Sequence, residues 1–305
     1  IASLVGYGTL RRGIVGDDTT GLSAKDNDIL LKHLKQALAE GAFGLSAGLA
    51  YSHESAITEV ELYQAAEILK DYDCLLSVHL RNESENIVEN AREAIDLARH
   101  TGIKLKIAHL KIRGRVNWDQ DDLLLQELET AWHQGVAVSF DLYPYAITWQ
   151  VLFSYLPKWA TLGGRKNLLQ HLNDPQQRRK IIDYLKTKHS RLGDLIITST
   201  TAKLNASGKT IAKISRGMDL SYEETLLKLI EHGGSEILVL DHDLDQKLVD
   251  KLSIHPLSLI ASDGGGFDPR INDKLVHPRC FGSAPKFLSY VLKEKQIELA
   301  QAVRK

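Results

Sequence analysis

The stretch CLLSVHLRNE (74–83), followed after a helical segment by KLKIAHLK (104–111), decides the fold. Each half is a short apolar run that ends in a histidine, His79 or His109, with a cation two residues later. The histidines are 30 residues apart, close to the roughly 30 residues of a strand–helix–strand unit. Residues 85–100 between them place apolar side chains at helical spacing. Both imidazoles are therefore expected at the carboxyl end of one parallel sheet, where α/β proteins build their sites.

A third apolar run, 257–262, leads directly into Asp263. A single histidine at a strand end is more often structural than functional, but its repetition in consecutive strands favours a functional role. Two neutral imidazoles and one carboxylate at the same sheet edge suit a divalent metal such as zinc. The pattern therefore predicts a metal site built from His79, His109 and Asp263.

Composition limits the class of protein. The chain has 305 residues, enough for one large barrel or two ordinary domains. Hydrophobic residues make up 43% and charged residues 25%, which is typical of a globular protein with a sizeable core. A net charge of −1 gives no electrostatic reason to expect a nucleic acid or an anionic membrane as partner.

The two cysteines, Cys74 and Cys280, form no disulfide framework and favour a reducing compartment, so a cytoplasmic location is predicted. No apolar run approaches the ~20 residues that span a bilayer. The chain begins at Ile1 without a methionine. We therefore expect it to be part of a longer protein, whose targeting cannot be read here.

Alternating strands and helices with short connections predict a parallel α/β fold. Residues 7–11 are predicted to form a glycine-rich turn, and the rhythm breaks after Tyr145. Strands are expected to start near Ile1, Ala42, Leu75, Leu105, Val136 and Leu257, with further runs at 195–199 and 237–240. Helices are expected at 26–40, 58–71, 85–100, 119–134, 244–252 and 284–304.

Taken together, these residues and several flanking motifs resemble the N-acyl-D-amino-acid deacylases (D-aminoacylases) of the amidohydrolase superfamily. The resemblance extends over nearly the whole chain, with its motifs in the family's order. They include GYGTLR (6–11), EGAFGLSAGLAY (40–51), VHLRNE (78–83), AHLK (108–111), DLYPY (141–145), ASDG (261–264) and HPRCFGSAPKFL (277–288).

The resemblance implies a fold and a cofactor. The fold would be a metal-dependent (β/α)8 TIM-type barrel, with residues 146–234 as a long insertion after the seventh strand and the first strands upstream of Ile1. The cofactor would be Zn²⁺, held in part by His79, His109 and Asp263. Asp263 would also be the catalytic general base and then general acid.

The resemblance also implies a substrate. Lys111, Tyr143 and Arg279 match the family residues that hold the substrate's α-carboxylate. The reaction would be zinc-dependent hydrolysis of the amide of a small molecule, an N-acyl-D-amino acid, to a carboxylate and a D-amino acid. The aromatic residues Trp149, Phe153 and Tyr155, with no cation between Tyr143 and Pro157, predict an apolar side-chain pocket, which favours neutral over acidic substrates.

Departures from the family pattern leave alternatives open. The family's His-x-His and bridging cysteine are absent from these 305 residues. Cys74 cannot substitute, because it lies five residues before His79 on the same strand, about 16 Å away. The fragment alone is therefore expected to be inactive, with unpaired edge strands that invite aggregation.

The rival functions are another amidohydrolase activity, such as cyclic-amide hydrolysis or deamination, and a catalytically inactive barrel used for binding. The oligomeric state cannot be read from the sequence.

Overall fold

The chain divides into two compact units in a computed structural model that describes residues 2–199, 206–268, 270 and 275–305. The first unit comprises Ile1–Pro144, Leu244–Asp263 and Ser283–Lys305. The second comprises Tyr145–Asp243 and Gly264–Gly282.

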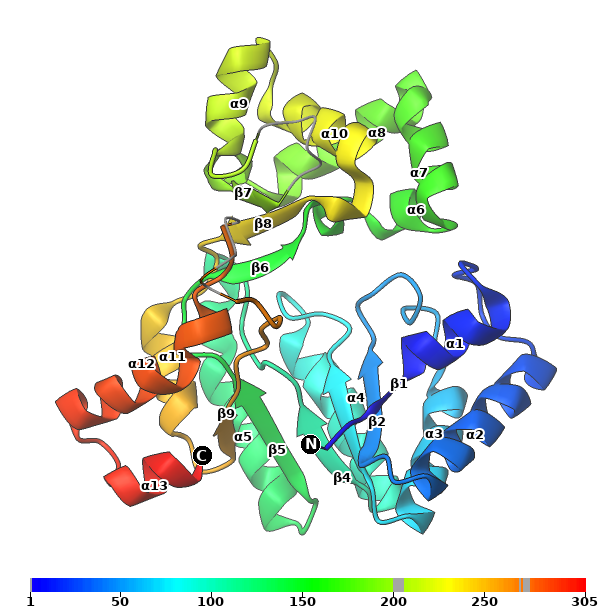
Figure 1. The fold of residues 1–305 in the computed structure, drawn as a ribbon, viewed down its shortest axis with the longest axis vertical. Helices are drawn as coiled ribbons and strands as arrows, with labels where there is room; N and C mark the ends of the chain where they lie inside the picture. Colours follow the sequence, from blue (N-terminus) through cyan, green and yellow to red (C-terminus); the bar gives the residue numbers. More distant parts are fainter. Residues whose placement is uncertain (1, 200–205, 269, 271–274) are drawn as a thin grey trace. The chain divides into compact units, whose positions relative to one another are not determined.

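The first unit is built on a six-stranded sheet in the order β1-β2-β3-β4-β5-β9 (Figure 1). Every neighbouring pair of strands is parallel, so the predicted α/β class with a parallel sheet is confirmed. The strands are β1 (Val5–Gly6), β2 (Gly44–Gly48), β3 (Leu75–His79), β4 (Lys104–Ile107), β5 (Val138–Leu142) and β9 (Ser258–Ile260).

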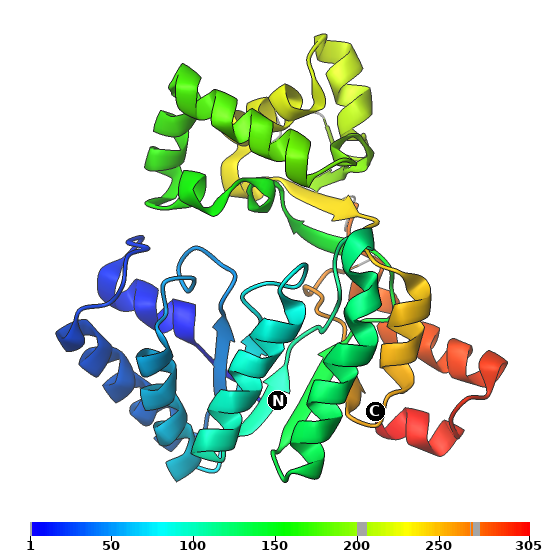
Figure 2. The ribbon, with the colours of Figure 1, turned by 180° about the vertical axis from the view of Figure 1, so that it is seen from behind.

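Helices connect these strands, and α1 to α5 pack against one another in chain order (Figures 1 and 2). Local sequence sets their ends: Thr58 and Glu61 form a capping box at the start of α3, and Gly102 ends α4 in the left-handed conformation. The helices are α1 (Tyr7–Val15), α2 (Ala24–Ala39), α3 (Glu59–Asp71), α4 (Ile87–Thr101), α5 (Asp121–His133), α11 (Gln246–Ile254), α12 (Arg279–Glu294) and α13 (Leu299–Arg304).

Buried apolar side chains hold this sheet in the core of the first unit. Leu76, Val78, Ile107 and Phe140 are at most 2% exposed, and burying each such side chain contributes about 1.5–3 kcal/mol. Gly44 has no side chain for a steric reason, since a Cβ there would overlap with backbone atoms of β3. In the resulting parallel register, the carboxyl ends of the strands lie at one edge of the sheet.

The two outer strands of the sheet, β1 and β9, each pair with a single neighbour within the described residues. The predicted strands at 195–199 and 237–240 do not extend this sheet. They form β7 (Ile196–Ser199) and β8 (Leu238–Asp241) in a separate sheet. The described part of the chain therefore contains the predicted parallel strands without closing them into a barrel.

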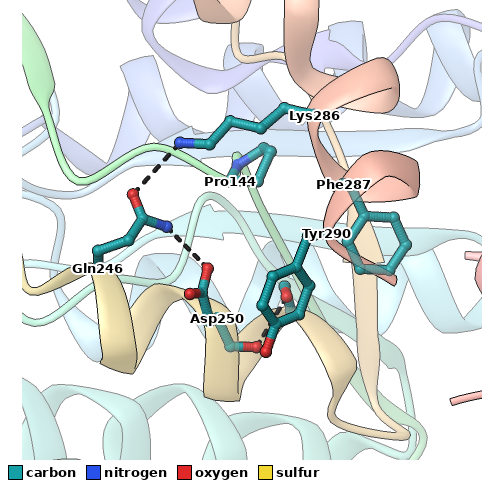
Figure 3. A pocket seen from close by; sticks show the side chains of 7 residues that line it. Pro144, Gln246, Asp250, Lys286, Phe287 and Tyr290 are labelled. Carbon is teal, nitrogen blue, oxygen red and sulfur yellow. Dashed lines mark hydrogen bonds between the residues drawn. The ribbon is translucent and has the colours of Figure 1, made fainter. Parts of the chain in front are cut away.

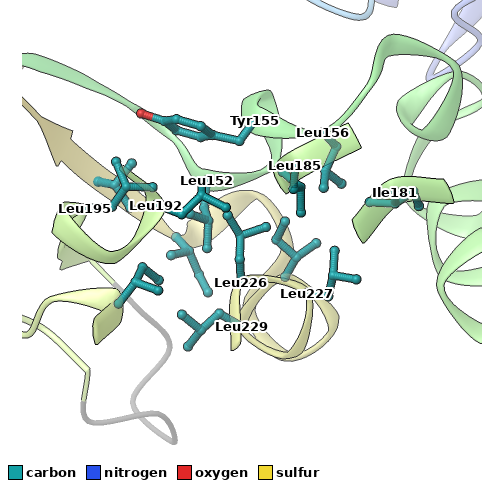
Figure 4. Packing of buried hydrophobic residues seen from close by; sticks show 14 of the residues in the cluster. Leu152, Tyr155, Leu156, Ile181, Leu185, Leu192, Leu195, Leu226, Leu227 and Leu229 are labelled. Atoms are coloured by element: carbon teal, nitrogen blue, oxygen red, sulfur yellow. The ribbon is translucent and has the colours of Figure 1, made fainter. Parts of the chain in front are cut away.

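The second unit has a three-stranded antiparallel sheet in the order β6-β8-β7, with β6 at Thr148–Val151. Its own core contains Leu152, Leu185, Leu226 and Leu227, all fully buried (Figure 4). The segment 146–234, expected as an insertion, falls within this unit. Its helices are α6 (Lys158–Thr161), α7 (Gly164–Asn173), α8 (Pro175–Lys188), α9 (Ile211–Met218) and α10 (Tyr222–Gly233).

Two local predictions are wrong. Residues 7–11 form the first turns of α1 rather than a glycine-rich turn. Gly8 belongs in this helix because the Glu54 carboxylate occupies the space of a Cβ and accepts the Gly8 backbone N–H. The tail is not one helix, because α12 ends before Lys295, whose φ of 52° is left-handed. In the described part of the chain, no helix combines the length and apolar character needed to span a bilayer.

Candidate metal centre

The predicted metal-binding histidines meet at the carboxyl edge of the parallel sheet of the first unit. His79 is the last residue of β3, and His109 follows β4 by two residues. The Nδ1 atom of His79 lies 2.9 Å from the Nε2 atom of His109, and the two rings cross at 76°. Two nitrogens bound to one tetrahedral zinc at 2.0–2.1 Å would be about 3.3 Å apart. The two imidazoles are therefore already close to the spacing of a shared metal.

A buried carboxylate that the sequence reasoning missed, that of Glu83, lies against the two imidazoles. The Oε1 atom of Glu83 lies 3.2 Å from Nδ1 of His109 and 3.8 Å from Nε2 of His79. Among the described residues, these three form the one His/Cys/Asp/Glu group whose ligand atoms all lie within 4.8 Å of one another. The sequence indicated Glu83 only through its position four residues after His79, in the VHLRNE motif.

The electrostatics keep this cluster in metal-binding protonation states. Burial lowers the pKa of His79 to about 3, although the Glu83 carboxylate opposes this. Burial alone would raise the pKa of Glu83, but the Lys111 ammonium and His79 hold that pKa well below its ordinary value. At neutral pH, the ring of His79 is therefore neutral, as metal coordination by an imidazole requires. The Glu83 carboxyl is ionised at the same pH.

Lys111 points into the cluster. Its Nζ lies 2.5 Å from Oε1 of Glu83, 2.8 Å from Nδ1 of His109 and 2.9 Å from the His109 carbonyl oxygen. Burial lowers the pKa of Lys111, against the opposing charge of Glu83. All three ammonium donors have neighbours inside the protein, so the predicted binding of a substrate carboxylate by Lys111 stays a prediction.

Asp141 fixes the backbone beneath His109. The Asp141 carboxylate, in β5, accepts the backbone N–H of His109 and pairs with Nζ of Lys106 at 2.6 Å. His109 has a left-handed φ of 39°, a conformation that costs a side-chain-bearing residue about 1–2 kcal/mol. The charge-assisted hydrogen bond that His109 N–H donates to Asp141 holds His109 in this strained conformation, in which its ring faces that of His79.

The remaining predicted site residues are distributed between the units. Asp263 follows β9 and, like His109, has a left-handed φ, here 44°. It contributes charge near Lys111 but is not part of the three-residue group around His79. Tyr143, next to the end of β5, is buried, and Arg279 begins α12 in the second unit. Their predicted roles stay predictions.

His277 and Tyr155 have structural positions in the second unit. His277 is fully buried, donates from Nε2 to the Ile147 carbonyl and accepts the Arg279 N–H at Nδ1. Tyr155 belongs to the hydrophobic core and donates its hydroxyl to Asp241. Tyr155, one of the three aromatic residues behind the expected apolar pocket, is therefore a core residue. The expected preference for neutral substrates stays a prediction.

The first unit also has a surface pocket of about 240 Å³ between α11 and α12 (Figure 3). A short polar chain crosses it: Lys286 donates to Gln246, and Gln246 donates to Asp250 at 2.7 Å. None of its lining residues is a predicted site residue.

Known proteins resemble this chain as a whole, in sequence and in fold. No family model matches the chain. An N-acyl-D-glutamate deacylase of Alcaligenes xylosoxydans xylosoxydans is 26% identical over 306 residues, covering 100% of this chain and 54% of that protein. The crystal structure of an N-acyl-D-glutamate deacylase from Bordetella bronchiseptica, with zinc and a phosphonate mimic of the tetrahedral intermediate, superposes with a TM-score of 0.80. It is 25% identical and covers 99% of this chain and 55% of that one.

The chain is similar in sequence and in fold to N-acyl-D-amino-acid deacylases. The resemblance predicted from the sequence motifs is thus confirmed. A D-aminoacylase structure that defines a novel subset of amidohydrolases shares the fold, with a TM-score of 0.77 at 23% identity over 99% of this chain and 55% of that one. The chain spans about half the length of the curated relatives it matches.

Proposed function

We propose that the protein containing this chain is a zinc-dependent hydrolase that converts N-acyl-D-amino acids to a carboxylate and a free D-amino acid. The observation that carries the proposal is the 2.9 Å approach of His79 Nδ1 and His109 Nε2 at the carboxyl edge of a parallel sheet. The similarity to N-acyl-D-glutamate deacylases, one of which is solved with zinc and a phosphonate mimic of the tetrahedral intermediate, supports the same reaction class.

The residues fit zinc. The two imidazoles offer nitrogen ligands, and the burial that keeps His79 neutral preserves its lone pair. When bound, zinc supplies a water acidified toward pKa ~7 and a Lewis acid for the carbonyl. We assign proton transfer to Asp263, as general base and then general acid toward the leaving amine. Zinc ligation by Asp263 remains part of the same proposal.

Substrate orientation is assigned to cationic and hydroxyl groups. Lys111 and Tyr143, both in the first unit, would bind the α-carboxylate, a geometry that presents the amide to the metal site. Arg279 is proposed for the same chemistry on the basis of the HPR motif. The acyl group and the amino-acid side chain of the substrate are left open.

We further infer that the six parallel strands belong to a closed (β/α)8 barrel and that the second unit is an insertion in it. Support comes from the uniformly parallel order of the sheet. The superposition on the Bordetella deacylase over 99% of this chain also favours a barrel. The separate core of the second unit favours an insertion.

The test is hydrolysis by the full-length protein, loaded with zinc and assayed on N-acetyl-D- and N-acetyl-L-amino acids. Zinc-dependent release of the D-amino acid is expected, with little release of the L-enantiomer. Hydrolysis of cyclic imides without amide hydrolysis would instead support the rival amidohydrolase activity. Zinc binding without turnover of any of these substrates would support a binding protein.

A further inference from the structure

The strongest unassigned feature is the placement of the Glu83 carboxylate on the outer side of both imidazoles. The inner nitrogens, His79 Nδ1 and His109 Nε2, face each other at 2.9 Å. The outer nitrogens both lie near one oxygen, Oε1 of Glu83, at 3.8 Å for His79 and 3.2 Å for His109. The inference drawn from this arrangement rests on the proposed zinc site.

The positions of the ring protons decide whether zinc can bind. A neutral imidazole carries one N–H and one lone pair. At 2.9 Å, the inner nitrogens of His79 and His109 form a hydrogen bond in the metal-free protein, so one of them carries a proton. Zinc needs a lone pair on both inner nitrogens. Each ring must then carry its proton on its outer nitrogen.

Two groups compete for the outer nitrogen of His109, with opposite effects. The Lys111 ammonium, 2.8 Å from Nδ1, can only donate, so it favours a lone pair there and a proton on the inner nitrogen. The ionised Glu83 carboxylate, 3.2 Å from the same atom, can only accept, so it favours the proton on Nδ1. The metal-binding tautomer is the one that Glu83 stabilises.

We propose that Glu83 is a positioning residue of the metal site, which accepts the Nδ1 proton of His109 and so keeps Nε2 available to zinc. Glu83 itself is not a ligand. Lys111 disfavours this tautomer. The Lys111 ammonium would therefore lose its hydrogen bond to Nδ1 of His109 when zinc binds. Carboxylates that orient metal-bound histidines in this way typically change metal affinity about 10- to 100-fold when removed.

The opposite effects of Glu83 and Lys111 give a test with opposite signs. Zinc affinity would be measured by chelator competition on the full-length protein carrying Glu83→Gln or Lys111→Met. We expect Glu83→Gln to weaken zinc binding about 10- to 100-fold and Lys111→Met to leave it unchanged or tighter. Wild-type affinity in Glu83→Gln, or equal weakening in both variants, would overturn the proposal, because a merely structural ion pair predicts equal weakening.

Glu61→Gln is the matched control. Glu61 is as buried as Glu83, at 8% and 9% exposed, but its carboxylate caps α3 through Thr58. Glutamine at this capping position preserves the hydrogen bonds. Glu61→Gln should bind zinc like the wild type. Weakening equal to that of Glu83→Gln would show a general effect of buried carboxylates and would refute the specific role.

Glu83→Gln leaves the Lys111 charge buried without its counter-ion, which can prevent folding. The double variant Glu83→Gln/Lys111→Met removes both charges. It should bind zinc more weakly than Lys111→Met alone, and equal affinities would contradict the proposal. X-ray absorption of zinc in the wild type and the double variant should show the same number of protein ligands. Loss of an oxygen ligand would make Glu83 a ligand and overturn the assignment.

Zinc binding by His79→Ala and His109→Ala separates this inference from the proposed function. If both variants bind zinc as the wild type does, the metal site itself is wrong. If both lose zinc while Glu83→Gln keeps wild-type affinity, the site stands and the role of Glu83 is refuted.

Discussion

Removing the Asp141 carboxylate should weaken zinc binding much more than it destabilises the fold. Asp141 accepts the His109 backbone N–H and pairs with Lys106 at 2.6 Å. The first contact holds His109 at its left-handed φ of 39°. We expect Asp141→Ala to let this backbone relax, so that the imidazole no longer faces His79.

The magnitude follows from opposing contributions. A hydrogen bond to a charged acceptor contributes about 1.5–3 kcal/mol, and the partly exposed ion pair with Lys106 adds roughly 0–1 kcal/mol. Relaxation of His109 from the left-handed region recovers about 1–2 kcal/mol. The free energy of unfolding should therefore fall by at most about 3 kcal/mol. Zinc affinity should fall at least about 10-fold, because the His109 ring loses its orientation.

Urea unfolding and chelator competition on the full-length protein measure the two quantities. Lys106→Gln is the control, because it removes the ion pair and leaves the hydrogen bond to His109. This control should keep the zinc affinity of the wild type. Wild-type zinc affinity in Asp141→Ala, or a loss as large in Lys106→Gln, would refute the reasoning that Asp141 acts through the His109 backbone.

Further predictions concern ligands, proton transfer, pH and the second unit. His79→Ala and His109→Ala should each abolish high-affinity zinc binding while circular dichroism shows an intact fold. Asp263→Ala should lower kcat far more than it raises KM, and unchanged kcat would remove its proton-transfer role. Burial raises the pKa of Glu54 above 4.5, so ionisation of Glu54 destabilises the folded state as pH rises through the folded pKa. The free energy of unfolding of the wild type relative to Glu54→Gln should therefore be highest at acid pH and fall toward neutral pH, and a difference that does not vary with pH would contradict this. Leu226→Ala should destabilise the second unit by about 2–5 kcal/mol because Leu226 is fully buried in its core, with zinc affinity unchanged.

The sequence was sufficient to predict the parallel sheet because short, mainly apolar runs alternate with amphipathic helical segments. It was not sufficient for β6, TWQV (148–151), in which polar and apolar residues are mixed and which pairs with a segment about 90 residues away. Helix α1 was missed because its glycines favour a turn. A tertiary contact, the Glu54 carboxylate at the Gly8 N–H, makes the helix possible.

The residues of the candidate site that follow the βα repeat could be predicted from the sequence. Those that a loop conformation brings into the site could not. His79 ends β3 and His109 follows β4 by two residues, so their spacing alone was enough to predict that they lie together. Glu83 lies in the loop after β3, where no periodicity indicates the direction of a side chain. Lys111 was predicted to bind the substrate's carboxylate from its motif. Its burial against Glu83 and His109 became visible only with the loop conformation in place.

The central claim is that His79 and His109 hold a catalytic zinc ion, and anomalous diffraction tests it most directly. Crystals of the zinc-loaded full-length protein would be measured on both sides of the zinc absorption edge. We predict an anomalous peak about 2.0–2.1 Å from Nδ1 of His79 and from Nε2 of His109, with Glu83 outside bonding distance of the metal. A protein that binds zinc but shows no peak between these two nitrogens would contradict the account.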